Sequence, residues 1–304
     1  MKFYFKLFTV LVGFVALSRG WACDLELEEK FNALPATDRG ISSATPGLDD
    51  LMRLFPGPSL SSTGKSFLTV NRMGFDVLNH PQFKNWLLED YEHFIDNKNL
   101  MVLDIGCGYG NLSLEPLEKG CTVIANDIAP EHLIQVRRKA HEKGLDLENL
   151  YLNNRSFPDQ TSFKNNSLDA VVLHRVLTFL SPEQIQEGVE KIKEWLKPGG
   201  KIFIVTMAPQ NKSFSEWFLP LYEEKWANGD KWPGVNMSVA RGLPDQAYNL
   251  PEYLHIMDER PLRLVLEQQG FKIEKANFIN MKQFGKPEDN RDGREAIGMI
   301  AIKQ

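Results

Sequence analysis

The sequence has few cysteines, no run of positive charge and no hydrophobic stretch as long as a typical membrane-spanning helix. Three cysteines occur among 304 residues, and their spacing gives no indication that Cys107 and Cys121 pair. We expect these two side chains to be small buried hydrophobic groups. The cysteines therefore do not indicate a redox compartment.

The lack of excess positive charge makes nucleic acid an unfavourable partner. The chain has 35 Lys and Arg against 40 Asp and Glu, a net charge of -5 and a pI near 5.8. Phosphate binding requires a basic surface that this composition does not supply. With 42% hydrophobic residues, the chain has the composition of a soluble globular protein with one large or two modest domains. A small-molecule substrate fits this charge better.

Residues 1–22 differ from the rest of the chain. They combine Lys2 and Lys6, an apolar stretch over residues 7–17 and the small-x-small site Gly20-Trp21-Ala22. This pattern is typical of a secretory signal peptide cleaved before Cys23. An uncleaved signal anchor is the alternative, whereas Gly20 and Trp21 fit a lipoprotein cleavage site poorly. The expected location is secreted or membrane-associated, with a cytoplasmic location as the alternative.

The central feature of the remaining sequence is VLDIGCGYG, at residues 102–110. Its first four residues are mostly apolar and β-favouring, which is typical of the end of a buried parallel strand. Gly106, Gly108 and Gly110 then permit a sharp turn, because glycine adopts positive φ and lets the main chain approach a ligand closely. The helix that follows presents free N–H groups. This stretch predicts a ligand-binding turn.

The spacing of these glycines argues against a nicotinamide dinucleotide. In the fingerprint G-x-G-x-x-G the third glycine would fall at Asn111, but here it falls at Gly110. Asp104, just before the turn, would repel a pyrophosphate and suits a cationic ammonium group. Asp127 ends a second apolar run, where its carboxylate can accept both hydroxyls of a ribose. The combination favours a ribose joined to an amino acid.

Four segments in this order resemble the class I S-adenosylmethionine (SAM) methyltransferases. The glycine turn is similar to the family's first motif, and residues 123–127 are similar to the second strand with its ribose acid. Residues 166–180 resemble the fourth strand and its exit, and LKPGGKIFIV resembles the approach to the fifth. The order and spacing agree over residues 100–205.

The resemblance implies an α/β fold with a Rossmann-like, seven-stranded sheet flanked by helices, whose last strand is antiparallel. The methyltransferase domain would span residues 99–304 and follow an N-terminal helical extension over residues 23–98. Residues 209–257, after the fifth strand, are rich in aromatics and longer than a simple crossover. We interpret them as a substrate lid, with a structural subdomain or a partner surface as the alternative.

Local patterns predict the individual elements. We expect helices over residues 67–78, from Pro81, over 130–143, over 182–196 after a capping box at Ser181, and over 262–270. We expect strands over residues 149–152, 169–173, 201–207, 271–280 and 295–302. Pro116 requires the helix after the glycine turn either to begin late, with Ser113 as its cap, or to be kinked. The apolar face of the helix from Pro81 either packs on the domain or shapes the substrate entrance.

The resemblance implies cofactor-binding residues at the carboxyl ends of the strands. It assigns Asp127 to the ribose hydroxyls, and Gly106 and Gly108 to the methionyl end of SAM. Asn154, after the third strand, is the candidate for the adenine amine, with an ordinary turn as the alternative. The expected cofactor-binding residues are Asp104, Gly106, Cys107, Gly108, Gly110, Asp127, Ile128, Asn154 and His174. No metal ligands are expected.

The implied chemistry needs no nucleophilic side chain. SAM carries its methyl group on a sulfonium, so the protein mainly has to align the acceptor and exclude water. A general base is optional. His174, at the exit of the fourth strand, is the candidate base, and packing beside the methionyl group is its alternative role. His255, Asp258 and the tyrosines of the lid are rival candidates.

Two functional interpretations of different class follow. The first is a SAM-dependent methyltransferase acting on a small-molecule acceptor, which the complete cofactor motif favours. The second is an exported, non-catalytic binding protein on the same fold. The signal-like N-terminus favours this second interpretation, because SAM is made in the cytosol. The glycine spacing makes a nicotinamide dehydrogenase the weakest interpretation.

Overall fold

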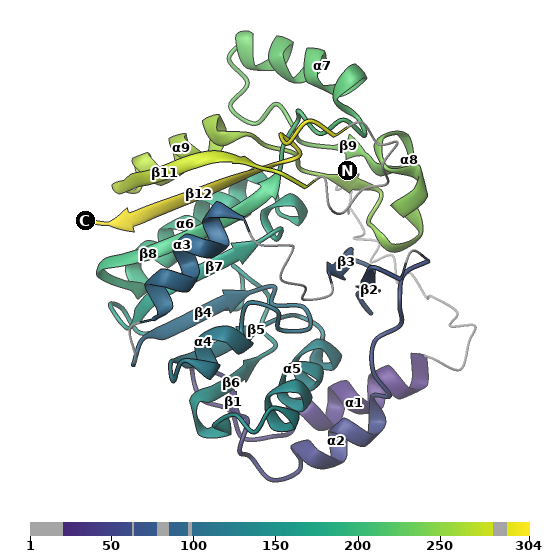
Figure 1. Ribbon diagram of the computed structural model, residues 1–304, viewed down its shortest axis with the longest axis vertical. Coiled ribbons are helices and arrows are strands. Elements are labelled where there is room, and N and C mark those ends of the chain that lie inside the picture. The colour runs from purple at the N-terminus through teal and green to yellow at the C-terminus, as the bar shows by residue number, and fades with distance from the viewer. Residues whose placement is uncertain (1–20, 63, 78–84, 97–98, 282–290) are drawn as a thin grey trace, which may run out of the picture.

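The glycine turn follows β4 (Met101–Ile105), a strand in the middle of the central sheet (Figure 1). A computed structural model of the protein describes residues 21–62, 64–77, 85–96, 99–281 and 291–304. Within these residues the sheet has eight strands, in the order β1-β6-β5-β4-β7-β8-β12-β11. The other strands are β1 (Ile41–Ser42), β5 (Thr122–Asn126), β6 (Leu150–Asn153), β7 (Leu168–His174), β8 (Leu196–Met207), β11 (Phe271–Ile279) and β12 (Ala296–Lys303).

The seven strands expected from the sequence are present, and β12 is antiparallel as predicted. It pairs with β8 on one side and β11 on the other. The five neighbouring strands β6, β5, β4, β7 and β8 are paired in parallel. Their carboxyl ends therefore meet at one edge of the sheet. The eighth strand, β1, comes from the N-terminal extension and pairs antiparallel with β6. Its two residues are too few to carry a strand pattern in the sequence.

Helices cover both faces of the sheet (Figure 1). On one face, α6 (Pro182–Trp195) and α9 (Glu259–Gln268) share an apolar core with β4, β7 and β8. On the other lie α3 (Trp86–Ile95), α4 (Leu114–Glu118) and α5 (Pro130–Glu142). Helices α1 (Trp21–Asn32) and α2 (Leu48–Leu54) contact α5. The N-terminal extension is therefore packed against the α/β domain.

Local sequence signals explain several helix ends. The capping box at Ser181 is present, with Gln184 as its partner and Pro182 in the first turn. After the glycine turn, α4 begins late, at Leu114, so that Pro116 lies in its first turn, which needs no intrahelical N–H bond. The late start was one of the two predicted alternatives. Ser113 occupies the cap position, but its hydroxyl bonds elsewhere.

The aromatic face of α3 packs on the sheet. Leu87, Tyr91 and Ile95 are buried, and the Tyr91 ring meets the Phe203 ring of β8 edge to face at 5.2 Å. The packing interpretation is therefore confirmed for this helix. It begins at Trp86, with Asn85 accepting the first N–H groups. Pro81, where the sequence placed its start, lies outside the described residues.

The helix predicted over residues 67–78 is wrong. The described part of this segment is a hairpin of β2 (Ser66–Leu68) and β3 (Phe75–Val77), and we call residues 66–77 the hairpin. Arg72 and Gly74 have positive φ angles of 55° and 121°, which are incompatible with a continuous right-handed helix. The apolar spacing was ambiguous between the two structures because the run is short.

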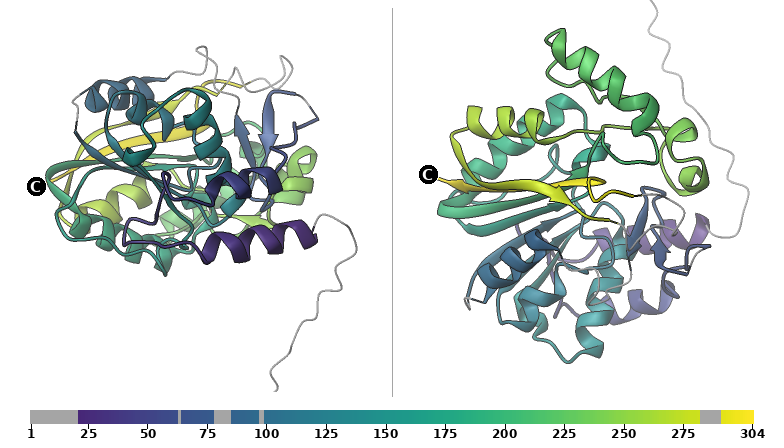
Figure 2. Two further views of the ribbon diagram at one scale, coloured as in Figure 1. Left: turned by 90° about the horizontal axis from the view of Figure 1, so that it is seen from below. Right: turned by 45° about the horizontal axis from the view of Figure 1, so that its top comes forward.

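The predicted lid is folded. It contains α7 (Ser215–Ala227), β9 (Met237–Ser238), α8 (Val239–Gly242), the 3-10 helix η4 (Pro244–Asn249) and β10 (Tyr253–Leu254). Its own apolar core includes Phe214, Phe218 and Tyr222. In the views of Figures 1 and 2, α8 and the hairpin lie on the same side of the molecule. The Phe75 ring of the hairpin meets the Tyr248 ring of the lid edge to face at 5.7 Å, and this contact joins the two segments.

The predicted signal segment lies mostly outside the described residues, which begin at Trp21. Helix α1 starts there, so the expected cleavage point between Ala22 and Cys23 falls in its first turn. No helix in the described part of the chain is long and apolar enough to cross a membrane.

Candidate functional site

The glycine turn lies at the carboxyl edge of the sheet, beside the ends of β5 and β7. Gly106, Gly108 and Gly110 all have positive φ, at 64°, 52° and 83°, which only glycine adopts at little cost. The Cys107 N–H donates to the Asn126 carbonyl at 2.9 Å and ties the turn to β5. The cysteine side chains at 107 and 121 are buried and unbonded to each other, as predicted. The sequence signal thus corresponds to a rigid turn.

A neighbouring side chain lies in close contact with each glycine of the turn. A Cβ on Gly106 would lie 2.4 Å from Cγ2 of Val176, which follows β7. A Cβ on Gly108 would lie 2.9 Å from Oδ2 of Asp76 in the hairpin. At Gly110 the neighbour is Val136 of α5, at 2.8 Å. At all three positions a neighbouring side chain therefore approaches the backbone so closely that only glycine fits.

Asp127 is buried directly after β5, where the sequence placed it. Its Oδ2 accepts the Gly108 N–H at 3.0 Å, and its Oδ1 accepts the Ala129 N–H at 3.0 Å. Burial opposes ionisation, but the interaction with His132 and the hydrogen bonds from the two N–H groups outweigh it and lower the pKa of Asp127. The carboxylate is therefore ionised at neutral pH and holds the glycine turn against β5.

His132, in the first turn of α5, was not identified from the sequence. Its Nδ1 lies 2.9 Å from Asp127 Oδ1, and the Val70 N–H donates to Nε2 at 3.2 Å. Nδ1 therefore carries the proton that Asp127 accepts, and the ring is neutral in this arrangement. Burial disfavours the imidazolium, but the neighbouring carboxylates raise the pKa of His132 above its usual value. His132 connects the hairpin to Asp127.

Asp104 lies buried in β4, next to the turn. Burial raises its pKa to about 7, although the Ser113 hydroxyl donates to Oδ2 at 2.6 Å and stabilises the charge, and Asp76 and Asp127 raise the pKa further. The sequence analysis treats Asp104 as a charged carboxylate, whereas this pKa leaves it partly protonated at neutral pH. The site thus holds a carboxyl group that titrates near neutral pH.

Asp104→Asn is expected to become more stable relative to the wild type as pH rises. The folded protein retains a proton on Asp104 up to about pH 7, whereas the unfolded chain loses it near pH 4, so wild-type stability falls between these values. The gain in stability of the variant relative to the wild type should reach on the order of a few kcal/mol, the free energy that corresponds to the difference between the folded and unfolded pKa values. Urea unfolding measures this gain at two pH values. The first is pH 4.5, about half a unit above the pKa of the unfolded chain, and the second is pH 8, about one unit above the pKa of the folded protein. A difference that does not change with pH would contradict the protonated carboxyl, and the exposed Asp159→Asn is the control.

Comparisons with known proteins find similarity in the region around this turn. Residues 102–200 match a family described as a methyltransferase domain. A ubiquinone biosynthesis O-methyltransferase of Idiomarina loihiensis is 34% identical over 119 residues, which are 39% of this chain and 45% of that protein. A malonyl-[acyl-carrier protein] O-methyltransferase of Enterobacter lignolyticus is 27% identical over 149 residues, 48% of this chain and 51% of that one.

The solved structure of a SAM-dependent methyltransferase from Methanosarcina mazei has the same fold. Its TM-score is 0.52 at 21% identity, over 72% of this chain and 98% of that one. Residues 102–200 are thus similar to a methyltransferase domain, and the fold is that of a SAM-dependent methyltransferase. The matches to the two O-methyltransferases named above span about half of those proteins' length.

The side chains of the methyltransferase domain fit SAM. Gly106 and Gly108 provide a surface where a side chain has no room. A carboxylate accepts about four hydrogen bonds, and Asp127 uses three of these positions, so Oδ2 retains one for a ribose hydroxyl. Ile128, beside it, is 47% exposed and offers apolar surface to an adenine ring. The turn, the acid and the apolar surface lie together as predicted.

Asn154, predicted to bind the adenine amine, contacts the N-terminal extension instead of the glycine turn. Its amide donates to the Asn32 side chain of α1 at 2.7 Å. The neighbouring Asn153 is buried and donates to the backbone of residues 38 and 39. The loop after β6 therefore anchors the N-terminal extension in this structure. The assignment of Asn154 to the adenine amine of the cofactor stays a prediction.

His174 ends β7 at the carboxyl edge, as predicted. Burial, together with the nearby Arg175 charge, lowers its pKa to about 3. A group with so low a pKa is a weak base at neutral pH. The electrostatics therefore favour the packing role that the sequence left as the alternative.

The rival candidates for a general base have mainly structural contacts. Asp258 caps α9 and pairs with Arg260 at 2.6 Å. The Tyr222 hydroxyl accepts the Asp258 N–H. His255 donates from Nδ1 to the Leu180 carbonyl at 3.0 Å, and its Nε2 has no partner within the described residues. Among these candidate bases, His255 therefore has a ring nitrogen, Nε2, that could accept a proton, although burial lowers the pKa of the ring.

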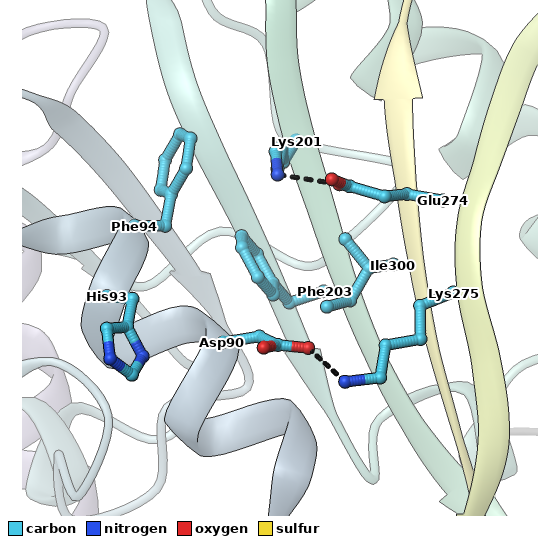
Figure 3. Close-up of a pocket in the computed structure, with 8 residues that line it drawn as sticks. All are labelled: Asp90, His93, Phe94, Lys201, Phe203, Glu274, Lys275 and Ile300. Atoms are coloured by element: carbon cyan, nitrogen blue, oxygen red, sulfur yellow. Dashed lines mark hydrogen bonds and ion pairs between the residues drawn. The ribbon is translucent and has the colours of Figure 1, made fainter.

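A separate hollow of about 460 Å³ lies away from the methyltransferase site. Figure 3 shows it between α3 and the strands β8, β11 and β12. Two ion pairs border it: Lys201 with Glu274 and Lys275 with Asp90, both at 2.6 Å. Lys201 lies six residues before Met207, the carboxyl end of β8. The hollow contains no predicted cofactor residue, and no group of three potential metal ligands occurs anywhere in the described chain.

Proposed function

We propose that the protein transfers the methyl group of SAM to a small-molecule acceptor. The observation that carries this proposal is the glycine turn, held by Asp127 of the neighbouring strand within residues that match a methyltransferase domain. The acidic net charge supports a small acceptor rather than nucleic acid.

The residues around the turn would bind and orient the cofactor. Gly106 and Gly108 would adjoin its methionyl end, Asp127 would accept a ribose hydroxyl, and Ile128 would cover the adenine. SAM, when bound, supplies an electrophilic methyl group on a sulfonium. The protein then has to hold the acceptor in line and exclude water.

The lid over residues 209–257 is proposed to provide that exclusion. Its Asn249 side chain donates to the Gly74 carbonyl of the hairpin, and Tyr248 packs on Phe75. The hairpin in turn contacts the glycine turn through Asp76 and Tyr109. These contacts support a role for the lid at the entrance of the site, where it would contact the acceptor.

Base strength bears on the kind of acceptor. Because the pKa of His174 is near 3, we propose that it packs beside the methionyl group and removes no proton. A phenol or thiol ionises readily enough to react without a strong base. The O-methyltransferase names of two similar proteins support testing oxygen acceptors first.

Binding and turnover test the proposal separately. Calorimetry of the full chain with SAM, S-adenosylhomocysteine (SAH) and NADH is expected to show binding of the first two alone. A panel of phenols, carboxylic acids, thiols and amines is then assayed for SAH release. Binding of NADH without SAM would overturn the proposal. SAM binding without SAH release from the panel or from source-cell extract would favour the non-catalytic alternative.

We also propose that residues 1–22 direct export or membrane attachment, on the basis of Lys2, Lys6 and the apolar stretch that follows. N-terminal sequencing of the protein from fractionated source cells is expected to begin at Cys23. Because SAM is made in the cytosol, a cleaved and active protein would indicate delivery to a SAM-containing compartment. Full-length protein confined to the soluble cytosol would contradict both export and anchoring.

A further inference from the structure

The hairpin contacts the glycine turn from outside the matched domain. The Tyr109 hydroxyl donates to the Leu68 carbonyl at 2.8 Å, and the Val70 N–H donates to His132. The third contact is made by Asp76, whose Oδ2 accepts the Tyr109 N–H at 2.6 Å. Residues 66–77 precede residues 102–200. The hairpin therefore adds a carboxylate that the family match does not include.

Asp76 lies directly against Gly108. Its Oδ2 is 2.9 Å from the position that a Cβ on Gly108 would take, and its Oδ1 accepts the side-chain amide of Asn111. The Gly108 N–H meanwhile donates to Asp127. Gly108 thus lies between two carboxylates, one from the domain and one from the hairpin.

This position is costly for a carboxylate. Burial raises the pKa of Asp76, while Lys139, the Tyr109 N–H and His132 lower it in part. Lys139 lies close enough to donate to the Tyr109 carbonyl at 2.7 Å. Asp104 adds a third carboxyl group near the same turn. A positively charged ligand beside Gly108 would offset the cost of gathering these groups.

We propose that Asp76 is a positioning residue that favours SAM over SAH. The inference rests on the proposed function, because it assumes that the glycine turn binds SAM. SAM carries one more positive charge than SAH, on its sulfonium, and the two are otherwise alike around the methyl group. A partly buried carboxylate at Gly108 attracts the charged sulfonium and has no such interaction with the neutral thioether. Loss of this attraction after transfer favours release of the product.

The ratio of SAH to SAM dissociation constants tests the proposal, because a purely structural residue would change both affinities equally. Calorimetry is performed on the full chain. Two neutral variants, Asp76→Asn and Asp76→Ser, both keep an acceptor for the Tyr109 N–H. Each is expected to lower the preference for SAM about tenfold, which corresponds to about 1.4 kcal/mol. Asp76→Glu keeps the charge and is expected to retain the preference, even if both ligands bind less tightly.

Two controls separate charge from structure. Asn111→Ala removes a neutral partner of Asp76 and is expected to weaken SAM and SAH binding by the same factor. Asp50→Asn removes an equal charge on α2, where the side chain is exposed and paired with Arg53, and is expected to match the wild type. Thermal unfolding verifies that each variant is folded.

An unchanged SAM preference in folded Asp76→Asn and Asp76→Ser would overturn the inference. Tighter binding of both ligands would also overturn it, because the hairpin would then be blocking the turn. In either case the wild type still binds SAM, and the proposed function stands. A wild-type protein that does not bind SAM would overturn both.

Discussion

Gly108→Val is expected to abolish SAM binding while leaving a folded protein. Gly108 has a φ of 52°, where a β-branched residue adds about 1–2 kcal/mol or more of backbone strain. The new Cβ would also lie 2.9 Å from the Asp76 carboxylate, so either the turn or the hairpin has to move. Both movements alter the surface on which we place the methionyl group. Calorimetry with SAM and circular dichroism measure the two parts of this expectation.

The chain offers a matched control for the backbone strain. Gly144, after α5, has a φ of 67° and no atom within 4 Å of an added Cβ. Gly144→Val should therefore carry a similar strain, with some loss of thermal stability and unchanged SAM affinity. If Gly108→Val bound SAM as tightly as Gly144→Val does, the turn would not be the cofactor site.

The features that the sequence predicted correctly depend on short-range patterns. The apolar run before Gly106 and the capping box at Ser181 each act within a few residues. Parallel strands alternating with helices then leave few permitted topologies. For this reason the positions of the strands along the chain, and the place of Asp127 at the end of one of them, could be predicted from local signals, whereas the antiparallel last strand was implied by the family resemblance.

The hairpin was missed because contacts distant in the sequence decide its structure. Asp76 bonds to Tyr109 and Val70 bonds to His132, 33 and 62 residues away. Within the hairpin itself, the apolar residues fit a helical spacing. Tertiary contacts of this kind commonly override local preference.

The same reason explains why two residues of the site were not identified. His132 has no neighbour in the sequence that distinguishes it from a helical surface residue, and its function becomes visible only when Asp127 and Val70 are placed around it. Asp76 belongs to a segment that the sequence assigned to a helix. The bond from Asn154 to Asn32 spans 122 residues and left no local signal either.

Asp127→Ala is expected to weaken SAM binding by about 1.5–3 kcal/mol, the usual range for a hydrogen bond to a charged group. This corresponds to a loss of about 10- to 150-fold in affinity. The structure adds a second expected effect. The N–H groups of Gly108 and Ala129, together with His132, lose their acceptor, so the variant should also unfold at a lower temperature.

Asp127→Asn separates the two effects. Its amide oxygen can still accept an N–H bond, so it should lose less stability than Asp127→Ala, while the missing charge should still weaken SAM binding. Calorimetry and thermal unfolding of both variants measure the difference, with the exposed Asp159→Asn as the control. If both folded variants kept the wild-type SAM affinity, Asp127 would serve only to hold the glycine turn against β5, and another group would bind the ribose.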